Sequence, residues 1–178
     1  MIDTMAIKTH KDEVYQPIPF LEYEKVEAQR KDCGERYRII KYNYGDFKDK
    51  TLIDICCANG YFPFRFLQDG GKTARGIEEK KELSSFMNAL AFEKNMDLIC
   101  DTSLNGLFDV DFDIGIYLDT HFHEETKGYP EYLAKHTKVC FTSSAERSQD
   151  YVLLLEKLFK NVEPIYQGFM ERIIYKCY

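Results

Sequence analysis

The sequence predicts an α/β fold built on a doubly wound, mostly parallel sheet. From Thr51 onward, short apolar segments of strand character alternate with segments of helical periodicity, the pattern of helices packed on both faces of a parallel sheet. Acidic residues stand at the ends of the first three strands, where such sheets bind their ligands. Two further strand-like segments close the chain, too near each other for a parallel crossover. They predict an antiparallel hairpin that completes a seven-stranded sheet.

Five strands are expected before the hairpin, at residues 51–57, 73–78, 97–101, 112–118 and 137–142. The clearest helix covers 80–94, where apolar residues recur at helical spacing: Leu83, Phe86, Met87 and Leu90. Shorter helices are expected at 61–69, where Pro63 fits the first turn, and from Ser148 to Asn161. The segments EPIYQGF and RIIYKCY form the hairpin.

The length of 178 residues predicts a single domain. Residues 51–178 form the sheet-containing core, and residues 1–50 form an N-terminal arm or helical cap. The arm starts irregularly, at Pro17 and Pro19, and becomes helical around Glu35–Tyr44. We find no internal repeat in the sequence.

Charge and cysteine content narrow the functional classes. The net charge of −6 argues against a protein whose main task is to hold a nucleic-acid backbone. Six cysteines occur at positions 33, 56, 57, 100, 140 and 177 without CxxC spacing, so neither a zinc site nor a disulfide framework is indicated. We expect Cys56 and Cys57 to face opposite sides of a strand. No signal peptide or membrane span is apparent, and the expected location is the cytoplasm.

The candidate site follows the first strand. Asp54 interrupts the apolar run TLIDICC, and Gly60 allows the backbone to approach a ligand before the next helix begins. Glu78 ends the second strand, where it can accept hydrogen bonds from both hydroxyls of a ribose, and Asp101 ends the third strand, near a base amino group. Structural roles remain open for each acid: Asp54 can satisfy backbone donors, Glu78 can be a first-turn helix acid, and Asp101 can be an ordinary loop residue.

The run RYRIIKYNYGDFKDKTLIDICCANGYFPFRFLQDGGKTARGIE, from Arg36 to Glu78, resembles the start of a class I S-adenosylmethionine-dependent methyltransferase. The final hairpin resembles that family's last two strands, and the likeness covers residues 29–178. In the family, the first strand ends in an acid-x-Gly-x-Gly-x-Gly loop. Here Asp54 matches the acid and Gly60 the last glycine, while Cys56 and Ala58 replace the first two glycines.

The resemblance implies S-adenosyl-L-methionine as the cofactor. It places Asp54 by the methionine amino group, Gly60 beneath the cofactor, Glu78 on the ribose diol and Asp101 near the adenine amine. One branch of the family also carries Gly-Tyr-Phe at this loop, together with upstream Gln-Arg and Glu-Arg pairs, which are Gln29-Arg30 and Glu35-Arg36 here. An arginine of the arm then pairs with the cofactor carboxylate or forms a surface salt bridge. The cofactor-binding candidates are Arg36, Asp54, Cys56, Ala58, Asn59, Gly60, Tyr61, Phe62, Glu78 and Asp101.

The catalytic candidates follow the fourth strand in LDTHFHEE. The resemblance places Asp119, Thr120, His121 and His123 over the methyl group, with a histidine as general base if the acceptor is protonated. Two alternatives stay open: the histidines are polar residues that start a helix, or HxHEE contributes to a metal site. No further ligand cluster supports the metal, so none is assigned.

Other functions have less support from the sequence motifs. A nicotinamide dehydrogenase requires GxGxxG, and aligning Cys56, Ala58 and Tyr61 with those positions gives no glycine. DNA methyltransferase motifs are missing after the fourth strand, so DNA is disfavoured. We expect methyl transfer to a small molecule, with RNA or protein as second choices and no membrane partner. The competing hypothesis is a non-catalytic protein of the same fold that acts as a binding or scaffold subunit.

Overall fold

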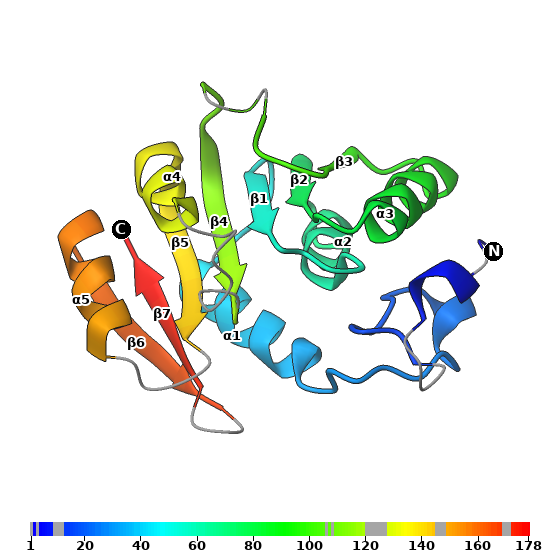
Figure 1. The fold of residues 1–178 in the computed structure, drawn as a ribbon, viewed down its shortest axis with the longest axis horizontal. Helices are drawn as coiled ribbons and strands as arrows, with labels where there is room; N and C mark the ends of the chain where they lie inside the picture. Colours follow the sequence, from blue (N-terminus) through cyan, green and yellow to red (C-terminus); the bar gives the residue numbers. More distant parts are fainter. Residues whose placement is uncertain are drawn as a thin grey trace.

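The computed structural model contains one seven-stranded sheet with helices on both faces (Figure 1). It describes residues 2, 4–8, 13–105, 107, 109–119, 128–144, 149–168 and 172–178. The strands are β1 (Thr51–Ile55), β2 (Thr73–Ile77), β3 (Leu98–Asp101), β4 (Phe112–Leu118), β5 (Thr137–Ser144), β6 (Val162–Gln167) and β7 (Ile173–Cys177). The helices are α1 (Cys33–Tyr44), α2 (Tyr61–Gln68), α3 (Lys81–Glu93), α4 (Tyr129–His136) and α5 (Gln149–Leu158), with two 3₁₀ turns, η1 (Met5–Ile7) and η2 (Leu21–Tyr23).

The strand order is β3-β2-β1-β4-β5-β7-β6. The first five strands are parallel, and β7 is antiparallel to both β5 and β6, as the sequence predicts. The order reverses between β1 and β4, which are direct neighbours, so the crevice outside their carboxyl ends is the expected ligand site. Strand β6 forms one edge of the sheet, and a register shift between Pro164 and Tyr166 interrupts its pairing with β7.

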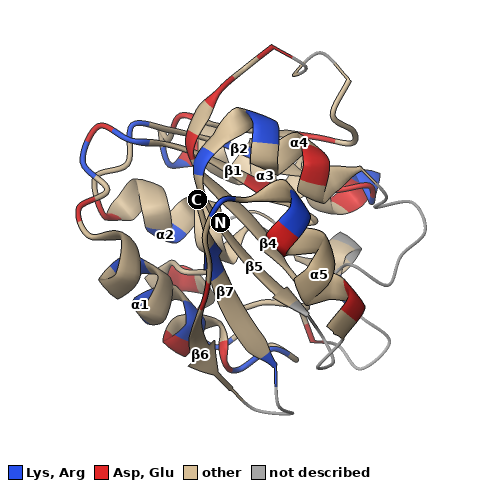
Figure 2. Cartoon of the chain, turned by 90° about the vertical axis from the view of Figure 1, so that its left-hand side faces the viewer, with Lys and Arg blue, Asp and Glu red and all other residues tan. Residues whose placement is uncertain are grey.

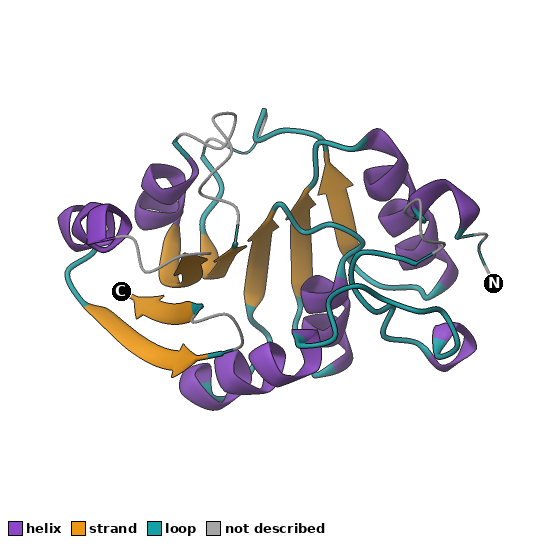
Figure 3. Ribbon diagram, turned by 60° about the horizontal axis from the view of Figure 1, so that its bottom comes forward, coloured by secondary structure: helices purple, strands orange, loops and turns teal. Residues whose placement is uncertain are grey.

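Alternating residues of the strands face two separate hydrophobic clusters. On β1, Leu52 belongs to the cluster that includes residues of α1, α2 and α3. Ile53 and Ile55 belong to the other, which includes residues of α4 and α5. The two helical layers on either side of the sheet are visible in Figure 3. This period of two in a strand buried on both faces is what the doubly wound fold requires.

The N-terminal arm folds back on itself and packs on the first helical layer. Val14 forms a bridge with Ala28, which closes the arm into a loop. Phe20 packs edge-on against Phe64 of α2, and the rings of Tyr23 and Phe86 of α3 lie 6.4 Å apart. In Figure 1 the arm lies beside α3, at the end of the molecule opposite the β6–β7 hairpin.

Several sequence expectations need correction. Strand β1 ends at Ile55, and Cys56 adopts φ of 58°, so the two adjacent cysteines do not continue the strand. Helix α4 was not predicted. Its sequence carries a usable signal, because Gly128 ends the preceding segment with φ of 94° and Pro130 stands in the first turn. The other strands and α-helices match their predicted positions with ends shifted by a few residues, and the turns η1 and η2 were not predicted.

Acidic and basic residues are interspersed along the chain in the view of Figure 2. Among the residues that the structure describes, no helix combines the length and apolar character needed to span a membrane. All six cysteines are free thiols, and no group of three metal-ligating side chains occurs within the described ranges.

Candidate active site

In the loop between β1 and α2, every second residue from Cys56 to Gly60 has a left-handed backbone conformation. Cys56, Ala58 and Gly60 have φ of 58°, 52° and 85°, and they occupy the three positions where the resembled family carries glycine. A left-handed backbone costs a residue with a side chain about 1–2 kcal/mol, because its Cβ approaches a carbonyl oxygen. Such strain persists only where the surrounding structure fixes the conformation. The backbone of Cys56 and Ala58 therefore has the left-handed conformation that glycine usually adopts, although neither residue is glycine.

Gly60 itself leaves no room for a side chain. A Cβ at this position would lie 2.6 Å from Cε of Met87 and 3.1 Å from a ring carbon of Phe64. The backbone of Gly60 donates a 2.9 Å hydrogen bond to the carbonyl of Cys57, which tightens the turn before α2 starts at Tyr61. The positive φ of Gly60 favours glycine here, and a side chain would also require the terminal methyl group of Met87 to shift.

The carboxylate of Glu78 lies against this loop. Its Oε2 accepts a 2.9 Å hydrogen bond from the amide of Ala58, and Oε1 accepts one of 3.0 Å from the amide of Lys80. Its own amide donates to the carbonyl of Asp101, which joins the ends of β2 and β3. A carboxylate has acceptor capacity beyond two hydrogen bonds, so Glu78 can still accept from a ligand hydroxyl while these two amides hold it.

Asp54 is buried in the sheet beneath the loop. It is 3% exposed, and its Oδ2 has no hydrogen-bond partner among the described residues. Burial raises the pKa of Asp54 well above its ordinary value, and the nearby carboxylate of Glu78 adds to the shift. An unpaired buried carboxyl costs stability, so this residue is a site candidate on physical grounds.

Asn59, in the same loop, forms side-chain hydrogen bonds with the N-terminal arm. Its Nδ2 donates to the carbonyl of Gln16 at 2.7 Å, and its Oδ1 accepts from the amide of Gln16 at 2.8 Å. The side-chain oxygen of Gln16 accepts a 3.1 Å hydrogen bond from the amide of Tyr61, the first residue of α2. No local sequence signal indicates Gln16, because its role depends on a contact with a residue 43 positions away.

Phe62 and Arg36 are both buried. Phe62 is 3% exposed within the first hydrophobic cluster, which is a core role. Arg36 is 4% exposed and donates to Asp119 Oδ2 at 2.8 Å and to Ser143 Oγ at 3.1 Å. A surface salt bridge is therefore excluded for Arg36, which instead forms a buried ion pair at the carboxyl end of β4.

Asp119 is surrounded by three guanidinium groups. Its Oδ2 accepts from Arg30, from Arg36 and, at 3.0 Å, from Arg172, while its Oδ1 accepts from Ser143 Oγ at 2.8 Å. The residue adopts φ of 63° directly after β4. We call Arg30, Arg36 and Arg172 the arginine cluster. Its members come from the arm, from α1 and from the position just before β7, so sequence spacing gives little indication of it.

The predicted residues Thr120, His121 and His123 lie outside the described residues. Their proposed role therefore stays a prediction.

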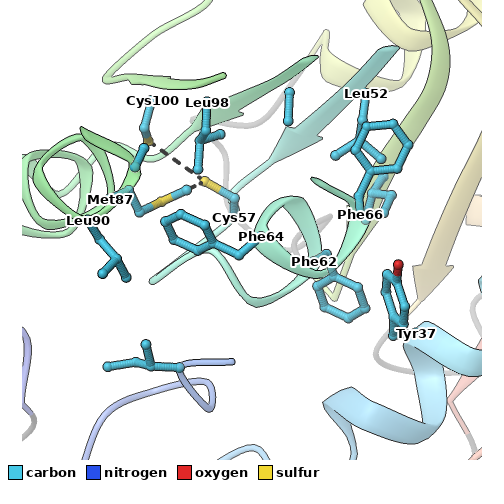
Figure 4. Close-up of a cluster of buried hydrophobic side chains, with 14 of the residues drawn as sticks. Tyr37, Leu52, Cys57, Phe62, Phe64, Phe66, Met87, Leu90, Leu98 and Cys100 are labelled. Carbon is cyan, nitrogen blue, oxygen red and sulfur yellow. Dashed lines mark hydrogen bonds between the residues drawn. The ribbon is translucent and has the colours of Figure 1, made fainter. Parts of the chain in front are cut away.

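Three sulfur atoms meet behind the loop (Figure 4). Cys57 Sγ lies 3.6 Å from Met87 Sδ and 3.8 Å from Cys100 Sγ. The strand between the two cysteines, β2, carries Gly76 at this level, and a Cβ there would lie 2.8 Å from Cys57 Sγ. Burial raises the pKa of the Cys57 thiol well above its ordinary value, which makes this thiol a packing group rather than a nucleophile.

Comparison with known proteins identifies the fold. No protein-family profile matches the chain, and no curated protein sequence matches it. Among solved structures, it is similar to the bifunctional kinase-methyltransferase WbdD, with a TM-score of 0.71 and 20% identity over 93% of this chain and 43% of that chain. The chain therefore spans less than half the length of WbdD.

Two other similar structures are covered more fully. A proposed RNA methyltransferase from Pyrococcus horikoshii has a TM-score of 0.60 and 16% identity, over 82% of this chain and 79% of that chain. The magnesium protoporphyrin IX methyltransferase from Synechocystis PCC 6803, solved with bound S-adenosylmethionine, has a TM-score of 0.63 and 15% identity, over 81% and 76%. The architecture of the sheet and its final hairpin agree with these neighbours, and the chain has the class I S-adenosylmethionine-dependent methyltransferase fold.

Proposed function

We propose that this protein binds S-adenosyl-L-methionine and transfers its methyl group to a small molecule. The observation that carries the proposal is the left-handed backbone at Cys56, Ala58 and Gly60. A chain that had lost its cofactor would be under no requirement to keep two strained residues in this loop. The similarity to methyltransferase structures supports the same activity.

The residues around the loop fit the cofactor. Glu78 is held by two backbone amides at the end of β2 and would accept hydrogen bonds from the ribose hydroxyls. Asp101, at the end of the neighbouring strand, would lie toward the adenine. The unpaired Oδ2 of Asp54 supplies a buried acceptor beneath the loop, toward the methionine amino group. Arg36 was also predicted to hold the cofactor carboxylate, but both of its terminal nitrogens already bond Asp119 and Ser143, so we do not assign that contact to it.

When bound, the cofactor supplies a methyl group on a sulfonium, which an acceptor takes by in-line displacement. The protein's contribution is to position the two reactants and, for a protonated acceptor, to remove a proton. The partners of Asp119 favour an organising role, because its carboxylate is already bonded to three guanidinium groups and to the Ser143 hydroxyl. His121 and His123 remain the proposed general bases.

One observation favours the alternative, a non-catalytic protein that uses this fold as a binding subunit. The amide of Tyr61 at the start of α2 is a donor of the kind that suits a cofactor carboxylate, and Gln16 already occupies it. Under this alternative, the arm permanently replaces the cofactor at the helix start.

Cofactor binding separates the two functions. We expect titration calorimetry to detect S-adenosylhomocysteine, the demethylated product, binding to the wild-type chain, and the same ligand to raise the melting temperature. Glu78→Ala should weaken binding by about tenfold or more, because it removes a charged hydrogen-bond acceptor. The exposed neighbour Glu79→Ala is the control and should bind like the wild type. If neither heat nor thermal stabilisation appears with the wild type, the binding-subunit function is favoured.

A further inference from the structure

The arginine cluster carries more positive charge than its described surroundings neutralise. Three guanidinium groups converge on the single carboxylate of Asp119, with side chains between 5% and 19% exposed. The next described carboxylate, that of Asp32, lies 4.0 Å from a terminal nitrogen of Arg36 and attracts Arg30 from a greater distance. Like charges held together away from water repel one another strongly, so such a cluster is stabilised by an additional anion.

The three arginines are not equally available to a ligand. Arg36 is the most buried, and both of its terminal nitrogens are engaged, by Asp119 and Ser143. Arg172 uses one terminal nitrogen on Asp119, while its Nε is buried and has no hydrogen-bond partner among the described residues. A guanidinium edge formed by Nε and a terminal nitrogen matches the two oxygens of a carboxylate or phosphate. Arg172 therefore binds Asp119 and still has one buried donor, Nε, that lacks a hydrogen-bond partner among the described residues.

Arg172 lies in a different part of the crevice from Glu78 and Asp101, the proposed contacts of the cofactor's adenosine. It directly precedes β7, whose first residue, Ile173, pairs with Ser144 at the carboxyl end of β5. Glu78 and Asp101 lie at the ends of β2 and β3, on the other side of the point where the strand order reverses. In a doubly wound sheet, that reversal divides the binding crevice into two halves. Arg172 belongs to the half that the proposed cofactor contacts leave for the acceptor.

We propose that the methyl acceptor carries an anionic group, a carboxylate or a phosphate, that Arg172 binds next to Asp119. Arg30 flanks the same carboxylate, is 18% exposed and stacks on the ring of Tyr15, so it supplies a second cation on the arm side. Asp119 acts as the resident counter-ion that holds the guanidinium groups in place before the acceptor arrives. The proposal rests on the proposed function and defines the chemical class of its substrate.

Inorganic phosphate is the probe for this site. Its dissociation constant is measured by thermal shift, at ionic strength held constant with sodium chloride, for the wild type and for Arg172→Gln. We expect phosphate to stabilise the wild type and to bind about tenfold more weakly to Arg172→Gln. Arg172→Lys, which keeps the charge but loses the planar fork, should fall between the two. Arg38→Gln removes an exposed cation of α1 and should bind phosphate like the wild type.

The variant is expected to fold, because Asp119 keeps two guanidinium partners when Arg172 is replaced. Urea unfolding of the ligand-free proteins checks this directly. A phosphate response that is unchanged in Arg172→Gln, or absent from the wild type, overturns the proposal.

A second arm of the experiment repeats the phosphate titration with saturating S-adenosylhomocysteine. An acceptor site should bind phosphate equally well with and without this ligand. Competition between the two would assign the cluster to the cofactor carboxylate and overturn the acceptor proposal. S-adenosylhomocysteine could fail to change the melting temperature while phosphate still binds through Arg172. In that case the proposed function fails and the bound anion is no longer assigned to a methyl acceptor, but the anion site itself is confirmed.

Discussion

The side chain of Asn59 exchanges two hydrogen bonds with the backbone of Gln16, at 2.7 and 2.8 Å. A loop that is proposed to hold the cofactor is thereby tied to an arm 43 residues earlier in the chain. Asn59 is fully buried, so no water replaces these bonds while the arm is in place. Arm docking and loop conformation are expected to change together.

Asn59→Ala should therefore loosen the arm. Loss of the Asn59 side-chain amide leaves the backbone N–H and carbonyl of Gln16 without hydrogen-bond partners in a buried position. This should lower the unfolding free energy by about 2–4 kcal/mol. Urea unfolding measures the loss, and limited trypsin digestion should cut after Lys25 sooner than in the wild type. Asn43→Ala is the control, because the Asn43 amide bonds only within its own helix. Equal protease resistance of the two variants would show that the arm is held elsewhere.

Replacing the two non-glycine residues tests the strain in the loop. Cys56→Gly with Ala58→Gly should relieve about 1–2 kcal/mol at each left-handed position, against about 0.5–1 kcal/mol per residue of added chain entropy. We expect a double variant that is slightly more stable and binds S-adenosylhomocysteine at least as tightly. Chemical unfolding and calorimetry provide both values. Ala74→Gly in the buried strand β2 should instead destabilise, and a double variant that behaved like it would refute the strain argument.

Gly60→Ala should have the opposite effect. The added Cβ meets Met87 at 2.6 Å and requires an unfavourable φ of 85°, so a loss of about 1–3 kcal/mol is expected together with weaker cofactor binding. Gly34→Ala is the matched control, since its Cβ would meet only the end of the Tyr61 side chain, at 3.3 Å. Alanine at this helical position should be neutral or stabilising, as measured by thermal unfolding.

Asp54 should make stability depend on pH. The pKa of Asp54 is raised in the folded state, so ionisation of this carboxyl destabilises the protein. The loss of stability begins as the pH rises above the unfolded pKa of about 3.9 and is complete once the pH exceeds the folded pKa. Asp54→Asn should therefore be more stable than the wild type at pH 8, by about 1–3 kcal/mol, and the difference should shrink as the pH falls toward 4. The same variant should bind S-adenosylhomocysteine more weakly.

Unfolding curves across this pH range, with exposed Asp97→Asn as control, measure the Asp54 effect. A difference between Asp54→Asn and wild type that stayed constant from pH 8 to pH 4 would contradict the shifted pKa.

Local sequence signals were sufficient for most of the fold and for part of the site. Periodicity predicted α3, and the short spacing of the last two strands predicted the hairpin. Asp54, Glu78 and Asp101 could be grouped because strand ends of a parallel sheet meet at one edge, and Ile77 indeed pairs with both Ile55 and Asp101.

Long-range contacts account for what was missed. Gln16 reaches the loop through the folded arm, and Arg172 reaches Asp119 across 53 residues, so no spacing rule connects them. Helix α4 is only eight residues long, too short for a clear period, although Gly128 and Pro130 mark its start. The φ of Cys56 also depends on the turn as a whole rather than on its own residue type.

The interruption in β6 has a consequence for how copies of this protein behave in solution. An outer strand offers unpaired backbone groups that invite intermolecular sheet growth, and Pro164, which lacks an amide proton, together with the register shift beside it, disfavours that association. The opposite outer strand, β3, is only four residues long. Both borders of the sheet thus resist aggregation, and replacing Pro164 with a β-branched residue is the change most suited to expose that risk.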